Sequence, residues 1–172
     1  ALDNVSVQSE IRHLELGSSE RPSQLATIVY SQSGQGHVNV APGLYDVIAS
    51  RGFEYSIDRR CIEVRHDTAP IEHFTVVQEV DTTGWVAGDF HVHGVNSFDA
   101  NYPHDRRLIS AVAEGLQLFS ATDHDYLTDL TPVLYDLGMR DDLHTMVGIE
   151  VSPLELGHIL GYPLRYDETV PE

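Results

Sequence analysis

GWVAGDFHVHG, at residues 84–94, is typical of a β-strand that ends in two histidines. A helix is predicted next over residues 103–116, because Pro103 stands at its start and apolar side chains recur at helical spacing up to Gly115. Further strands are expected at residues 116–125, 144–152 and 157–164, and a second helix at residues 130–139. Strands that alternate with helices predict a parallel sheet, whose ligand site gathers at the carboxyl ends of the strands.

Metal-binding side chains occur at each of these predicted strand ends. The first strand ends in a His-Val-His motif, and residues two apart project to the same face of a strand. The second and third strands end in a histidine and a glutamate, an aspartate follows in the first loop, and a histidine begins the fourth strand. The predicted metal ligands are His91, His93, Asp99, His124, Glu150 and His158.

The types of these side chains indicate hydrolytic chemistry. Imidazoles and carboxylates without a thiolate favour Zn, Mn or Fe over a structural zinc, and a carboxylate such as Glu150 can bridge two ions. Such ions lower the pKa of a bound water toward ~7 and neutralise charge that develops in the transition state. Asp123 is expected to orient His124 or a neighbouring ligand without binding metal. Three other polar residues nearby are not expected to be ligands: His104, His144 and Asp125.

Residues 1–83 have a different pattern, in which short runs of β-branched and aromatic residues are separated by turn formers. Strands are expected at residues 25–31, 44–51, 61–66 and 73–80. This pattern predicts an antiparallel β-sandwich of Ig-like or prealbumin-like type over residues 1–83, joined to a second domain over residues 84–172. The histidines of the first part are scattered without metal-ligand spacing, so we assign this domain no chemistry.

The charge of the chain excludes several classes of partner. Ten Arg and no Lys stand against 27 acidic residues, which gives a net charge of −17. Binding to nucleic acid or to an anionic membrane is therefore not expected, and a small-molecule ester is the favoured substrate. Cys61 is the only cysteine and cannot form an internal disulfide, and no apolar run reaches the ~18 residues of a membrane span. An acidic surface without Lys is also common in proteins from high-salt habitats. This explanation of the charge is compatible with a metal site.

In this order, the motifs resemble those of the PHP superfamily of metal-dependent phosphoesterases, named for its polymerase and histidinol phosphatase members. The likeness covers about residues 84–164 and rests on GDFHVHG (88–94), SATDHD (120–125), GIEVS (148–152) and the GH of ELGHILGYPL (155–164). The resemblance implies that the six predicted ligands hold two or three divalent metal ions at the mouth of a distorted (β/α)7 barrel. The expected fold is therefore an α+β chain in two parts, a β-sandwich followed by the first part of that barrel.

The sequence of the first domain indicates which branch of the PHP superfamily the chain resembles. APGLYDVIASRGFEYSI at residues 41–57, followed by a PHP motif, is similar to the CehA/McbA branch. The name-giving members of that branch hydrolyse the carbamate ester carbaryl, and its sequences often carry export signals. This chain begins at Ala1, which leaves open both an exported protein whose signal has been removed and a cytoplasmic protein.

One part of the PHP pattern is missing. Members of the family also carry a C-terminal Asp or Asn with a nearby His, whereas no His follows His158 here. The 85 residues from Gly88 to Glu172 (172 − 88 + 1) are also fewer than the roughly 200 or more of a closed barrel. We therefore expect an amino-terminal piece of a longer protein, or a partner chain that supplies the remaining strands.

Three functions are compatible with the sequence. A metal-bridging hydroxide would attack the phosphorus of a phosphoester, which is the default of the superfamily, or the carbonyl carbon of a carboxylic or carbamate ester, as in the carbaryl hydrolases. A different class of function is that of a non-catalytic binding or scaffold protein with a degenerate metal site. No substrate-binding residue in the sequence decides among them.

Overall fold

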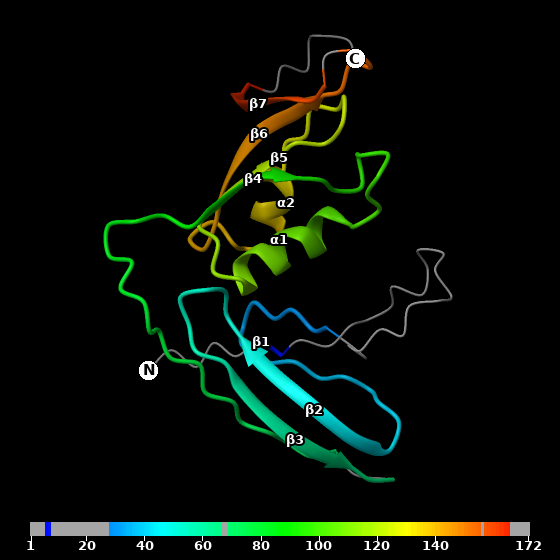
Figure 1. Ribbon diagram of the computed structural model, residues 1–172, viewed down its shortest axis with the longest axis vertical. Helices are drawn as coiled ribbons and strands as arrows, with labels where there is room; N and C mark the ends of the chain where they lie inside the picture. The colour runs from blue at the N-terminus through cyan, green and yellow to red at the C-terminus, as the bar shows by residue number, and fades with distance from the viewer. Residues whose placement is uncertain (1–5, 8–27, 67–68, 156, 166–172) are drawn as a thin grey trace. The chain divides into compact units, whose positions relative to one another are not determined.

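The computed structural model describes residues 6–7, 28–66, 69–155 and 157–165. The chain divides into two compact units, Ala1–Thr83 and Gly84–Glu172, and the boundary lies where the sequence pattern changes. The described residues form an α+β structure with one antiparallel sheet, one mixed sheet and two helices (Figure 1). Neither of these helices is both long enough and apolar enough to cross a membrane.

The first unit contains a three-stranded antiparallel sheet in the order β1-β2-β3. Its strands are β1 (Ser6–Val7), β2 (Gly43–Ser50) and β3 (Asp58–Val64). β2 and β3 confirm the strands predicted at residues 44–51 and 61–66. Ala49 and Phe74 are buried in a small core, against which Val47 and Ile62 pack.

The strand predicted at residues 73–80 is not formed, although residues 77, 79 and 80 make backbone hydrogen bonds with residues 54 and 56. Two other backbone groups of the segment are bound by side chains. The Thr75 N–H donates to the Asp58 carboxylate at 2.9 Å, and the Val77 N–H donates to the Ser56 hydroxyl at 2.9 Å. This segment makes only one isolated bridge, and it still buries Phe74. The apolar pattern therefore reports burial correctly but not the backbone pairing.

The predicted β-sandwich is not formed by the described residues of the first unit. Residues 25–27 of another predicted strand lie outside the described part of the chain, and residues 28–31 contribute a single bridging residue. The only sheet among the described residues before Gly84 is that of β1, β2 and β3. The observed architecture of this unit is a small antiparallel sheet.

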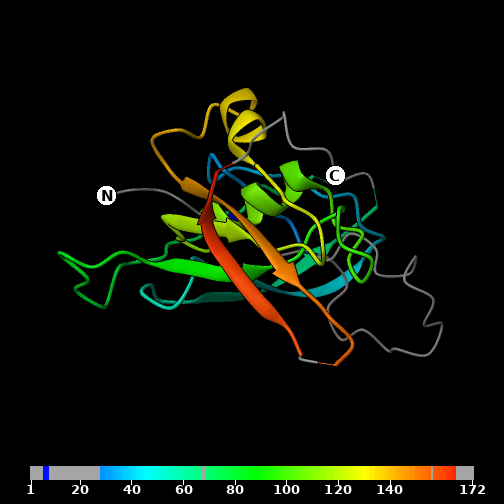
Figure 2. The same ribbon diagram turned by 90° about the horizontal axis from the view of Figure 1, so that it is seen from above.

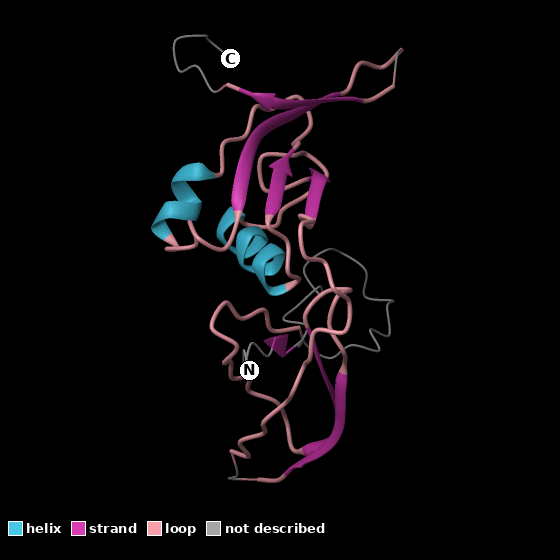
Figure 3. Ribbon diagram, turned by 90° about the vertical axis from the view of Figure 1, so that its left-hand side faces the viewer, coloured by secondary structure: helices cyan, strands magenta, loops and turns pink. Residues whose placement is uncertain are grey.

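The second unit is a four-stranded sheet in the order β4-β5-β6-β7 with two connecting helices. The strands are β4 (Gly88–Val92), β5 (Leu118–Ala121), β6 (His144–Val151) and β7 (Ile159–Leu164), and the helices are α1 (His104–Ala113) and α2 (Thr131–Asp136). β4, β5 and β6 are parallel, and both helices lie on the same side of the sheet (Figure 3). These elements confirm the alternation of strands and helices predicted from the sequence.

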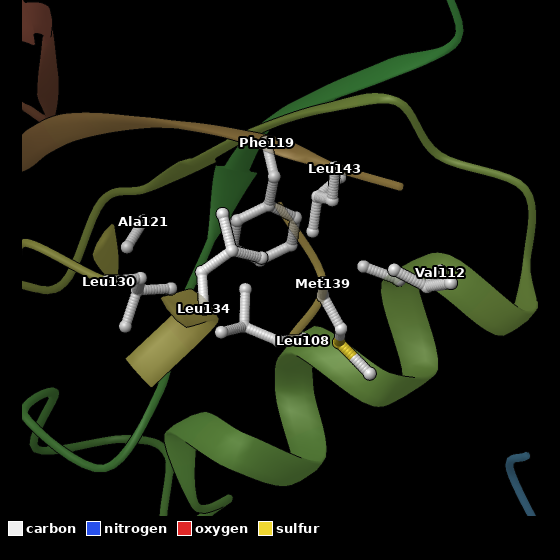
Figure 4. Close-up of a cluster of buried hydrophobic side chains, with 9 residues drawn as sticks. Leu108, Val112, Phe119, Ala121, Leu130, Leu134, Met139 and Leu143 are labelled. Carbon is white, nitrogen blue, oxygen red and sulfur yellow. The ribbon is translucent and has the colours of Figure 1, made fainter. Parts of the chain in front are cut away.

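The helices are held on the sheet by a core of apolar side chains (Figure 4). Leu108 and Val112 come from α1, Phe119 from β5 and Leu134 from α2, and all four are buried. Gly115 and Gly138, with φ angles of 79° and 69°, follow the two helices and allow the chain to turn back into the sheet. This core fixes the positions of the strands whose ends carry the predicted ligands.

The fourth strand departs from the prediction of an all-parallel sheet. β7 pairs antiparallel to β6, and the two strands form a hairpin (Figure 2). Only residues 152–158 connect them, which is too short for the helical crossover that a parallel pair needs. The start of β7 therefore lies beside the carboxyl end of β6. No closed barrel is present in the described part of this unit.

Candidate metal centre

The carboxyl ends of three parallel strands and the start of β7 meet at one edge of the second unit's sheet. The chain just after β5 is tied to both neighbours: the Thr122 N–H donates to the Val92 carbonyl at 2.8 Å, and the Glu150 N–H donates to the Asp123 carbonyl at 3.0 Å. His124 also forms a parallel bridge with Glu150. Side chains from separate strand ends are thereby brought into one volume.

Glu150 is the centre of this edge. Its side chain is only 1% exposed, and its Oε2 lies 3.0 Å from His91 Nε2 and 2.9 Å from His93 Nε2. The same oxygen lies 3.5 Å from His124 Nδ1, and Oε1 lies 2.6 Å from His158 Nδ1. One buried carboxylate therefore contacts four imidazoles that come from three separate segments of the sequence.

Asp99 supplies a second carboxylate on the other side of the histidines. Its Oδ1 lies 3.2 Å from His93 Nδ1, and its Oδ2 lies 3.4 Å from His124 Nε2. The ring centroids of His93 and His124 are 4.5 Å apart, with the rings edge to face. His93 and His124 thus each lie between two carboxylates, with one ring nitrogen near Asp99 and the other near Glu150.

The geometry fits divalent metal ions. Three groups of side chains have ligand atoms that lie within 4.8 Å of one another in each group. The groups are His91, His93 and Glu150; His93, Asp99 and His124; and His124, Glu150 and His158. They share members, as ligands of neighbouring ions do, and their nitrogen and oxygen atoms suit Zn, Mn or Fe. The structure thus brings together all six side chains that the sequence singled out.

Both carboxylates of the cluster favour their charged form. Burial by itself raises the pKa of Glu150, but the surrounding imidazoles, above all His91, lower it by more, so the net pKa lies below the ordinary value. The Ser97 hydroxyl is the main reason that the pKa of Asp99 is also lowered, with smaller contributions from His93 and His124. Negative charge is therefore available at the centre to hold cations.

Ser97 connects three parts of the site and was not predicted from the sequence. Its hydroxyl oxygen is 3.0 Å from His93 Nδ1, donates to Asp99 Oδ1 at 2.7 Å and accepts the His124 N–H at 3.2 Å. The side chain is buried. Its position two residues before Asp99 was the only available signal, because the contact to His124 spans 27 residues of sequence.

Ser152 and Arg107 also support individual histidines without having been predicted. The Ser152 hydroxyl lies 2.5 Å from His124 Nδ1. Arg107 Nη2 donates to the His93 carbonyl at 2.7 Å, and its guanidinium lies 4.7 Å from the centre of the Tyr102 ring. Partners of this kind fix the orientation of metal-binding imidazoles in known metal sites.

Asp123 has a different role from the one expected. Its buried carboxylate accepts the Gly94 N–H at 2.6 Å and the Thr128 hydroxyl at 2.5 Å. These bonds tie the residue that follows His93 to the segment on both sides of His124, and no imidazole in the described part of the chain is bonded to this carboxylate. Asp123 therefore shapes the backbone that carries the candidate ligands.

The residues that were not expected to bind metal lie outside the three ligand groups. His104 begins α1, and His144 begins β6 at the end of the strand opposite Glu150. Asp125 is a loop residue with a φ of 51°, and its carboxylate accepts the Ser152 N–H at 2.9 Å. It holds the loop after β5 against the loop after β6.

Gly148 brings β5 and β6 close together two residues before Glu150. A Cβ atom at this position would lie 2.4 Å from the Ala121 carbonyl oxygen and 2.6 Å from Ser120 Oγ. Neither separation is tolerated between real atoms, so any side chain here would force the strands apart. The glycine of the GIEVS motif is thus required by strand spacing.

Comparisons of the chain with protein-family models, with curated proteins and with solved structures give no match. The functional conclusion therefore depends on the chemistry of the centre itself.

Proposed function

We propose that the second unit is a PHP-type metal-dependent hydrolase, with a phosphoester of a small molecule as its substrate. The observation that carries the proposal is the contact of the buried Glu150 carboxylate with four imidazoles. Burying a carboxylate is costly unless partners or cations compensate it, so a structure that places one among ring nitrogens is suited to binding cations. Two or three ions of Zn, Mn or Fe fit the three overlapping ligand groups.

The residues of the chain have distinct parts in this proposal. Glu150 and Asp99 provide the negative charge, and the four histidines provide the neutral ligands. Ser97 and Ser152 fix the ring orientation of His93 and His124 through their hydroxyl groups. Divalent cations held there would activate water and offset the negative charge that develops on an ester oxygen during hydrolysis.

A second candidate is hydrolysis of a neutral carboxylic or carbamate ester. Arg107 is the cation that bonds to the backbone of the ligand segment, and its guanidinium is engaged by the His93 carbonyl and the Tyr102 ring. A substrate phosphate would then depend on the metal ions for its charge compensation, whereas a neutral ester needs none. Hydrolysis of a neutral ester is therefore compatible with the same centre.

The finer fold that we propose is the first part of a distorted (β/α)7 barrel, with further strands supplied from outside residues 84–172. Phe90 on β4 and Tyr162 on β7 support it, because their rings stack at 5.6 Å although β5 and β6 lie between their strands. A sheet must curve strongly to bring its two edges this close. For residues 1–83 we retain the β-sandwich as a proposal, supported by the burial of Phe74 against Ala49 of β2.

The test is hydrolysis by the chain after chelation and reloading with zinc or manganese. We expect turnover of 4-nitrophenyl phosphate that is lost in His91→Ala and retained in His73→Ala, the same change at an exposed histidine of the first unit. Turnover of 4-nitrophenyl acetate alone would favour the second candidate. Bound metal without hydrolysis of either compound would contradict both and leave a binding or scaffold protein.

A further inference from the structure

Phe98 presents an aromatic ring to solvent beside the candidate centre. The side chain is 81% exposed, yet its ring stacks on that of His124, with centroids 4.6 Å apart and planes inclined by 23°. One face of Phe98 therefore lies against a candidate metal ligand. The high exposure leaves most of the remaining ring surface accessible to a molecule that reaches the centre.

The position of this ring is set by its neighbours in sequence. Ser97, on one side, makes hydrogen bonds to His93, to Asp99 and to the backbone of His124. Asp99, on the other side, contacts the same two histidines. Single exposed apolar side chains are common on proteins, but this one stands between two residues that are fixed to the centre. The ring is held over His124 without being buried.

The charged groups of the centre have partners within it, although the buried Arg107 Nε has no hydrogen-bond partner among the described residues. The two carboxylates face the histidines, and Arg107 is bound to the His93 carbonyl and to Tyr102. Phe98 is more exposed than Val95, the other exposed large apolar side chain of this loop, and its flat face can select a substrate. Aromatic rings attract other flat rings in offset or edge-to-face geometry at centroid separations of about 4.5–7 Å.

We propose that Phe98 determines specificity by stacking on a flat, unsaturated group next to the ester bond, so that aryl esters are preferred over alkyl esters. This inference rests on the proposed hydrolase function and adds to it the class of group that flanks the scissile bond. It applies equally to a phosphoester and to a carboxylic ester, because the stacked group is the part that the two substrates share.

Binding of phosphonates, which are not hydrolysed, tests the inference separately from activity. The zinc-loaded chain would be titrated calorimetrically with phenylphosphonate and with methylphosphonate, in the wild type and in Phe98→Ala and Phe98→Tyr. The control is Tyr135→Ala, which removes another exposed aromatic ring, one on α2 that lies under the Arg140 guanidinium. Zinc content is measured for each protein.

We expect Phe98→Ala to weaken phenylphosphonate binding by roughly three- to tenfold and methylphosphonate binding by less than about twofold, at unchanged zinc content. Phe98→Tyr and Tyr135→Ala should bind both compounds as the wild type does. Equal weakening of both phosphonates, or no change in either, would overturn the role of Phe98 while leaving the hydrolase proposal intact. A wild type that holds zinc but binds neither phosphonate would overturn this inference and count against the phosphoesterase proposal.

Discussion

Replacement of Glu150 by Gln tests whether the cluster is a shared metal centre. The substitution keeps the size of the side chain and removes its charge. Glu150 belongs to two of the three ligand groups, so its loss leaves only the group of His93, Asp99 and His124 complete. We expect the zinc content to fall from two or three ions per chain to one, because a neutral amide is a much weaker ligand for zinc than a carboxylate.

A graded series makes this prediction quantitative. His158→Gln removes a member of one group only and should leave one more ion bound than Glu150→Gln does. Loss of a ligand should also lower the binding affinity for the affected ions. The loss should be at least ~10- to 100-fold, which is typical of removing a partner outside the coordination sphere. The matched control is Glu63→Gln, the same chemical change on the exposed part of β3.

Metal content is measured by mass spectrometry after the chain is loaded with zinc and desalted, and thermal unfolding is recorded to confirm that each variant is folded. The reasoning would be refuted by a folded Glu150→Gln variant that retains as many ions as the wild type. Equal losses in Glu150→Gln and His158→Gln would show that the carboxylate does not bridge two groups.

Three further predictions concern the support of the site and the stability of the two units. Ser97→Ala should lower zinc affinity by about 10- to 100-fold in a competition titration, with partial recovery in Ser97→Thr; unchanged affinity would contradict the orienting role of the hydroxyl. Phe119→Ala should destabilise the second unit by about 3–5 kcal/mol in urea unfolding, and a loss below about 1 kcal/mol would contradict its place in the core. The pKa of Asp58 is lowered, mainly by the hydrogen bond from Arg60 and then by that from the Thr75 N–H. The charged carboxylate therefore stabilises the fold at pH values above its unfolded pKa. This stabilisation is lost as the pH falls through the lower pKa of the folded state. Asp58→Asn should therefore be less stable than the wild type at pH 7, with a difference that closes below about pH 4; a difference independent of pH would contradict this account.

The sequence predicted that the six candidate side chains would cluster, because strand alternation and the β-α pattern can both be read from it. Alternation within β4 places His91 and His93 on one face, and the parallel pairing of β4, β5 and β6 brings His124 and Glu150 to the same edge. The apolar spacing of both helices and the glycines that follow them were also sufficient to locate α1 and α2.

The errors of the sequence-based prediction have physical causes that the pattern of apolar residues does not contain. The segment around Phe74 has the composition of a strand, but the Asp58 and Ser56 side chains bind the Thr75 and Val77 N–H groups, and only the residues that follow bond to the backbone of residue 54. The orientation of β7 depends on the length of its connection to β6, and the strands expected at residues 144–152 and 157–164 already left too few residues for a helical crossover. Ser97 was missed because its role arises from contacts with residues far apart in the sequence, including His124.

The absence of a side chain at Gly148 matters for the design of a similar cluster in another protein scaffold. Copying only the imidazole and carboxylate side chains would not be enough, since the side chains of a functional site tolerate displacements of only about 0.5 Å. A methyl group at residue 148 would widen the gap between β5 and β6 and carry Glu150 away from His124. In this protein the position of the Glu150 carboxylate thus depends on the absence of a Cβ atom two residues earlier in the same strand.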